Sequence, residues 1–312
     1  MTIAVIDAIL RHQLFLDGLK LGQANRLNEV MVKIDKDLRQ TLSIWRYDEL
    51  GTMPKQKLRE LVSRLREIML TSLDPYFDEM VKWFEFYMRE DRQTFVELYS
   101  EYKPTEEVEE KTPDEKRLWG LVWAAPMAAT GVLAAILLRN AKLNMTAKIE
   151  RLVVPAYANN ATIDELIASI RGTKAANYRD GELNRLYRAT KSANDTIIQH
   201  IAAQVNLNVS SRLFEEYEWV SVIDNVTTQI CRKRDGKRWF YGRGPVPPAH
   251  YGCRSSTVPV INGEADYADL TLEQWLRRQP ENIRTDLRAW AKAARALTLE
   301  QFAKKRKTIL QP

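Results

Sequence analysis

The stretch WVSVIDNVTTQICRKRDGKRWFYGRGPVPPAHYGCRSSTVPV, residues 219–260, differs in character from the sequence on either side of it. Its opening part continues a β-branched, alternating run that starts near Glu216, which predicts a strand. Asp235-Gly236 is typical of a hairpin turn, Pro247-Pro248 marks a second turn, and STVPV predicts a second short strand. We therefore expect a small β-containing module here.

Away from this module, apolar residues recur at helical spacing. One face consists of Leu27, Val30, Met31, Ile34, Leu38 and Leu42. Asp74-Pro75 has the form of an N-cap followed by proline at the first helical position, which predicts a new helix start. Thr162 and Glu165 form a capping box that opens a helix ending at Gly172. The predicted fold class is mainly α with a small α+β module.

Composition shifts suggest how the chain is organised. Residues 103–116, KPTEEVEEKTPDEK, are acidic, contain two prolines and hold almost no apolar side chains, so we expect a domain boundary there. The predicted regions are a helical N-terminal region (1–103), an acidic linker (104–117), a helical middle region (118–215), the β/loop module (216–262) and a helical tail with a basic end (263–312).

Residues 118–138, LWGLVWAAPMAATGVLAAILL, carry no charge and are long enough to span a bilayer. Pro126 and Gly131 interrupt them near the middle, and alanine is abundant, which weakens the hydropathy signal. We expect a buried, kinked core helix. Insertion into a membrane under particular conditions is the alternative.

Aromatic residues crowd the helix expected after Asp74. They fall on several faces of that helix, so two interpretations stay open: a satisfied core, or a core together with a partner-binding surface. The candidate partner-binding residues are Tyr76, Phe77, Trp83, Phe84, Phe86 and Tyr87.

The charge of the chain is concentrated in one place. The net charge is +6 over 312 residues, and the segment 231–254, called here the basic segment, holds seven cations against the single acid Asp235. The rest of the chain is therefore neutral. The seven cations are Arg232, Lys233, Arg234, Lys237, Arg238, Arg243 and Arg254. An acidic partner should be sought at this segment first.

The two cysteines of the chain also lie in this segment. Two cysteines in so long a chain exclude a disulfide scaffold. His250 and Cys253 are three residues apart, and Cys231 could join them. Zinc would suit these three ligands, with Asp224 or Asp235 as a fourth. A disulfide between the cysteines, or two packed thiols beside a hydrogen-bonded histidine, are the other interpretations.

Catalysis has little support in the residues. A Cys–His nucleophile pair is conceivable, but the chain shows no recognisable orienting residue or oxyanion donors beside it. The chain also lacks a Walker loop, a dinucleotide-binding glycine pattern, an HExxH motif and a G-x-S-x-G motif. We therefore expect a protein that is not an enzyme and needs no cofactor, zinc excepted.

The same stretch resembles the Mu-F-type domain of phage minor head (head morphogenesis) proteins. The motif core consists of Asp224, Thr227, Cys231, Pro247, Pro248, His250 and Cys253. Weaker similarity extends upstream to about Ala147 and downstream to Gln279-Pro280, so it covers about half of the chain. Many members carry a second cysteine after the arginine at the motif end, where this chain has Ser255, which removes a potential fourth thiolate.

The resemblance implies a non-enzymatic, low-copy virion component of a tailed phage, assembled in the host cytoplasm. Such proteins associate with the portal protein during head assembly, are packaged in the head, and some are linked to DNA. Capsid or scaffolding proteins are further expected partners. We assign the portal contact to the N-terminal helices and the aromatic helix. The alternative is an internal ejection protein that binds DNA and enters the host envelope through residues 118–138.

The basic segment fits contact with double-stranded DNA. Its seven cations can meet phosphates, and the interleaved Trp239, Phe240 and Tyr241 can cover sugar or an exposed base. An acidic surface of a portal subunit is a second possible partner. In the third interpretation the segment is a solvated loop whose cations pair with acids elsewhere in the chain.

Overall fold

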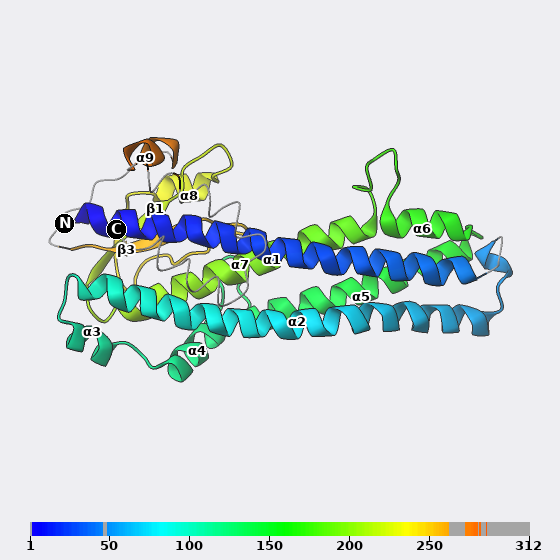
Figure 1. Ribbon diagram of the computed structural model, residues 1–312, viewed down its shortest axis with the longest axis horizontal. Coiled ribbons are helices and arrows are strands. Elements are labelled where there is room, and N and C mark those ends of the chain that lie inside the picture. The colour runs from blue at the N-terminus through cyan, green and yellow to red at the C-terminus, as the bar shows by residue number, and fades with distance from the viewer. Residues whose placement is uncertain (1, 46–48, 262–271, 280, 282–284, 286–312) are drawn as a thin grey trace. The chain divides into compact units, whose positions relative to one another are not determined.

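A computed structural model describes residues 2–45, 49–261, 272–279, 281 and 285. The chain is mainly helical with one small antiparallel sheet, which confirms the predicted fold class (Figure 1). The helices are α1 (Thr2–Ile44), α2 (Lys55–Ser100), α3 (Thr105–Lys111), α4 (Glu115–Ala124), α5 (Ala134–Ala158), α6 (Ile163–Arg171), α7 (Glu182–Ser210), α8 (Gln229–Arg234) and α9 (Leu272–Arg278), with a 3-10 turn at Leu50–Thr52. The strands are β1 (Glu216–Ser221), β2 (Arg238–Phe240) and β3 (Ser255–Pro259).

The chain divides into two compact units that do not follow its linear order. Unit 1 comprises residues 1–23, 82–135 and 194–312, and unit 2 comprises residues 24–81 and 136–193. The long helices α1, α2 and α7 contribute to both units. Each unit therefore gathers segments that lie far apart in the sequence.

The structure of unit 2 confirms the apolar helix face and the capping box predicted from the sequence. Leu27, Ile34, Leu38 and Leu42 of α1 are completely buried, as are several residues of the same type on α2. The capping box is present as predicted: the Thr162 hydroxyl accepts from the Glu165 N–H, and the Glu165 carboxylate accepts from the Thr162 N–H. Gly172 ends this helix at a φ of 97°. Local chemistry thus determines where α6 begins and ends.

The predicted helix start at Asp74-Pro75 is wrong, because α2 continues through Pro75 without a break. An interior proline costs a helix roughly 3 kcal/mol. The side chains beside it, Leu73, Tyr76 and Phe77, are all buried, and each such burial stabilises the folded chain by roughly 1.5–3 kcal/mol. Packing therefore outweighs the proline at this position.

Residues 118–138 do not form one helix, in contrast to the expectation. The helix α4 ends at Ala124 and α5 begins at Ala134. Between them the carbonyl of Met127 accepts hydrogen bonds from the N–H groups of Thr130 and Gly131, and Gly131 takes a φ of 72°. Within the part of the chain that the structure describes, no helix is long and apolar enough to cross a membrane.

The acidic stretch interpreted as a linker is folded and belongs to unit 1. Residues 105–111 form α3, and Val108 in that helix is completely buried. Arg92 of α2 donates to the carbonyl of Pro113 and pairs with Glu109. The buried valine and the contacts of Arg92 help to dock a segment that composition alone marks as a connector.

The sheet has the strand order β2-β1-β3, with β1 antiparallel to both neighbours. β1 and β2 form an antiparallel pair, but Asp235-Gly236 is not a tight turn between two strands: the connection from β1 to β2 includes α8, and Asp235-Gly236 ends that helix. The Gly236 N–H then donates to the carbonyl of Trp219, which brings the chain back beside β1.

Two amide side chains of α7 attach the sheet to the helices of unit 1. Gln199 donates to the carbonyl of Ser255, at 2.9 Å, and Asn206 donates to the carbonyl of Thr257, at 2.7 Å. Both amides are buried, so each satisfies a backbone group of β3 that solvent cannot reach. These contacts position the module that carries the candidate site.

Unit 1 also contains a buried polar cluster. His12 of α1 lies 2.5 Å from the carboxylate of Asp91 on α2, and the Tyr87 hydroxyl donates to the other oxygen of that carboxylate at 2.9 Å.

Trp275 of α9 donates its indole N–H to Asp7. The helix predicted in the tail is therefore present at 272–278, and the basic end of that tail lies outside the described residues.

Candidate functional site

The candidate site is built around β1, the central strand of the module. Trp219 on β1 is completely buried and packs with Cys231 and Cys253. Its indole N–H donates to the Ser221 hydroxyl at 2.9 Å. Because β1 has a neighbour on both edges and is buried from Tyr217 to its end, it supplies a rigid support for the loops around it.

The loop that follows β1 is organised by Asp224. Its carboxylate accepts from the N–H of Val226 and the hydroxyl of Thr227, and it pairs with Arg254 at 2.6 Å. Burial alone would raise the pKa of Asp224, but the hydrogen bonds from Arg254 and Thr227 outweigh it and the pKa is lowered. Asp224 and Thr227 of the motif core therefore hold the loop in shape.

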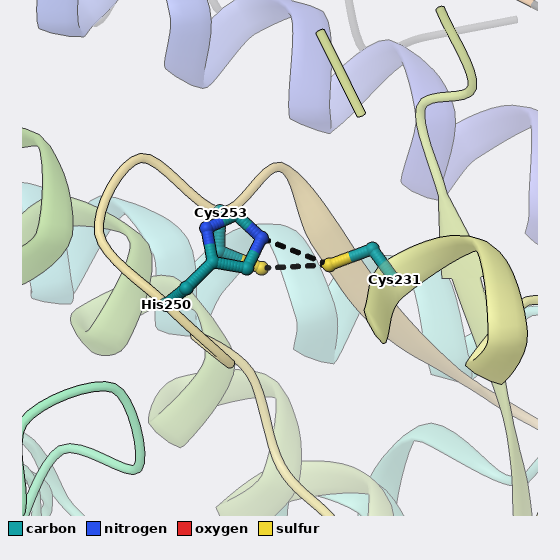
Figure 2. A group of neighbouring side chains, drawn as sticks. All are labelled: Cys231, His250 and Cys253. Atoms are coloured by element: carbon teal, nitrogen blue, oxygen red, sulfur yellow. Dashed lines mark hydrogen bonds between the residues drawn. The ribbon is translucent and has the colours of Figure 1, made fainter. Parts of the chain in front are cut away.

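Cys231, His250 and Cys253 come together as the sequence suggested. Their ligand atoms all lie within 4.8 Å of one another. The Cys231 sulfur is 3.8 Å from the Cys253 sulfur and 3.1 Å from His250 Nε2 (Figure 2). Both cysteines are free and buried. Pro247 and Pro248, which precede His250, are buried as well.

The pKa values of the two thiols are shifted in opposite directions. The hydrogen bond from the Cys231 thiol lowers the pKa of Cys253 to about 5 against the effect of burial, and the backbone N–H groups of Ala249 and Ser255 act in the same direction. The same thiol pair and burial raise the pKa of Cys231. Cys253 therefore gives up its proton more readily than Cys231 does.

The carboxylates offered as a fourth metal ligand do not join this group. Asp224 pairs with Arg254, and Asp235 accepts from the Ser221 N–H at 2.6 Å. Among the described histidines, cysteines and acids, the cluster has the three members Cys231, His250 and Cys253. Asp224 holds Arg254 and its own loop, and Asp235 holds the backbone of β1, so neither carboxylate is a member of the cluster.

The seven cations of the basic segment fall into two groups. Four make contacts within the module. Arg232 donates to the carbonyls of Asp224 and Thr227, Arg234 lies over the Trp219 ring, Arg238 pairs with Glu218, and Arg254 pairs with Asp224. The other three, Lys233, Lys237 and Arg243, are exposed and form no ion pair with any described residue. Two acids from β1 and the loop after it thus offset part of the charge that the sequence concentrates here.

The interleaved aromatic residues are less available than their sequence positions suggest. Trp239 and Tyr241 are half-buried and pack against Tyr217, and Tyr241 also donates to the Ser210 hydroxyl. Phe240, between them on β2, is 50% exposed. Alternation along a strand explains the difference, since neighbouring side chains point to opposite faces. Phe240 is the ring that a ligand can reach.

The candidate partner-binding aromatics of α2 belong to the core. Tyr76, Phe77, Trp83, Phe84 and Tyr87 are all buried, and Phe86 retains partial exposure. Of the two interpretations left open by the sequence, the structure supports the satisfied core for these five rings. They cannot contact a partner unless the helices separate.

Several residues of the site carry no signal in the sequence. The Thr228 hydroxyl lies 2.8 Å from His250 Nε2. The hydroxyls of Ser221 and Ser255 form a hydrogen bond with each other beside Cys231. Small polar residues at strand ends and helix starts are common, so nothing in their spacing marks them. Their role follows from tertiary proximity.

Comparison of the chain with protein-family models, curated proteins and solved structures found no match.

Proposed function

We propose that the chain is a non-enzymatic minor head protein of a tailed phage, resembling the Mu-F-type family, and that its β/loop module contacts packaged DNA. The observation that carries the DNA contact is the exposure of Lys233, Lys237 and Arg243, together with Phe240, on a module otherwise held rigid by its own contacts. Cations that pair with no other described residue can neutralise DNA phosphates, which releases the counterions condensed on the DNA.

The proposed portal contact can no longer be assigned to the aromatic rings of α2. The buried aromatic rings of α2 are not a suitable docking surface, so the portal contact rests on the motif resemblance and on helix faces other than those rings. The envelope-entry alternative relied on residues 118–138 as one apolar segment. Since two helices and a loop occupy that stretch, no structural observation favours this second candidate.

The DNA contact predicts a specific salt dependence. In a chain carrying Lys233→Gln, Lys237→Gln and Arg243→Gln, the slope of log binding constant against log salt should fall in magnitude by about 2.7, because each phosphate contact contributes about 0.9. Fluorescence anisotropy with a double-stranded fragment of random sequence, titrated at several salt concentrations, measures this slope.

The matched control removes the same charge from unit 2. Arg139, Lys148 and Lys174 are exposed and form no ion pair with described residues, so their triple replacement by glutamine should leave the slope near that of the unaltered chain. An equal decrease of this slope in the two triple variants would show that DNA binding depends only on the net charge of the chain. An unchanged slope in the first variant would remove the module from DNA binding.

A further inference from the structure

Three metal-ligating side chains converge in the module although they come from two separate segments. Cys231 lies on α8, while His250 and Cys253 lie in the connection from β2 to β3. In Figure 2 the His250 nitrogen and the Cys253 sulfur both face the sulfur of Cys231. The proposed DNA contact does not use these groups, so their arrangement calls for a separate explanation.

The distances match those of ligands on one ion. Zn–S bonds of about 2.3 Å in tetrahedral geometry place two sulfurs about 3.8 Å apart. The Cys231 and Cys253 sulfurs are 3.8 Å apart, whereas a disulfide requires about 2.0 Å. His250 Nε2 lies 3.1 Å from the Cys231 sulfur, against about 3.6 Å between sulfur and nitrogen ligands of zinc. A small movement of the imidazole therefore completes three ligand positions.

The hydrogen bonds of His250 leave the correct nitrogen available. Nδ1 lies 2.8 Å from the carbonyl oxygen of Tyr251. A carbonyl only accepts, so Nδ1 carries the proton and the lone pair of Nε2 faces the sulfurs. The Thr228 hydroxyl, 2.8 Å from Nε2, donates to that lone pair in the metal-free chain. An ion bound to Nε2 replaces this hydrogen bond. A carbonyl that fixes the tautomer in this way is the usual outer partner of a metal-bound histidine.

We propose that Cys231, His250 and Cys253 bind one zinc ion, with a water molecule in the fourth position on the solvent side of His250. Two sulfurs and one imidazole suit zinc, whereas magnesium and calcium prefer oxygen ligands. His250 is partly exposed and the sulfurs are buried, so the ion enters past the imidazole. The ion joins α8 to the loop that ends at Cys253, and it cross-links a module whose sheet has only three short strands.

The experiment uses the full chain, expressed without a histidine tag and purified in zinc-containing buffer. After dialysis against metal-free buffer, mass spectrometry of the metal content should find about one zinc per chain, and Cys231→Ser or Cys253→Ser should remove it. Thr228→Val is the matched control: it removes the hydroxyl beside His250 and no ligand, so zinc should stay bound.

A second measurement keeps the test valid if the serine variants do not fold. Cobalt added to the metal-free, unaltered chain should give the visible absorption of a tetrahedral site and the sulfur-to-cobalt charge-transfer bands of thiolate ligands. Absence of zinc and of these bands, with two free thiols on titration of the denatured chain, would overturn the proposal in favour of packed thiols. Loss of both thiols to a disulfide in the freshly purified chain would overturn it equally.

Discussion

Replacing Asp91 by alanine is expected to lower the free energy of unfolding by about 2–6 kcal/mol, because it leaves two buried polar groups without their acceptor, each at a cost of about 1–3 kcal/mol. The Asp91 carboxylate is completely buried and contacts both His12 and Tyr87. The substitution removes the acceptor that these two groups share, and both groups are buried away from solvent. His12 Nδ1 has no hydrogen bond to any described residue, so the imidazole would lose the contact at its other nitrogen.

Urea denaturation of the full chain, followed by circular dichroism, measures this loss. The matched control is Glu85→Ala on the same helix, because Glu85 pairs with Arg89 on the exposed surface. Surface pairs contribute about 0–1 kcal/mol, so this variant should unfold near the midpoint of the unaltered chain. Comparable stabilities for the two variants would show that the buried cluster does not hold α1 and α2 together in unit 1.

Replacing Trp219 by alanine is expected to cost about 3–5 kcal/mol, the usual range for truncating a buried tryptophan. Trp219 is one of the two largest side chains that are fully buried among the described residues, and it packs on both cysteines from the central strand. Its loss also removes the indole hydrogen bond to Ser221 and the ring beneath Arg234. The module should therefore loosen around the cysteines.

Two measurements check this expectation: the free energy of unfolding, and the rate at which the cysteines react with iodoacetamide in the folded, metal-free chain. The rate should rise in Trp219→Ala. Phe240→Ala is the control, because Phe240 lies on the adjacent strand β2 and is 50% exposed. A Trp219→Ala chain with unchanged stability and thiol reactivity would contradict the role assigned to this ring.

Local signals in the sequence predicted the helices well and the connections poorly. The spacing of Leu27 to Leu42 and the Thr162 capping box depend on residues within a few turns, and the structure confirms both. Pro75 and the Asp235-Gly236 pair are local signals too, but at Pro75 the burial of the flanking side chains outweighs the proline. Asp235-Gly236 directly follows the helical residues of α8. The pair therefore ends this helix and does not form a turn between two strands.

The candidate site was predictable only in its residue types. The spacing of His250 and Cys253 marked them as possible ligands, but the proximity of Cys231 depends on how α8 lies against β1. The pairing of Arg238 with Glu218 likewise depends on strand register, which sets these two residues opposite each other. A count of charges along the sequence could not show which cations remain exposed.

The most direct test of the proposed role is the protein content of purified phage particles. DNA-filled heads of the phage that encodes the chain should be separated on a density gradient, and the chain should be quantified against the portal protein with isotope-labelled peptides. A minor head protein should copurify with the heads and the portal in low copy. Recovery of the chain only in the soluble lysate, with none in the heads, would contradict the proposal.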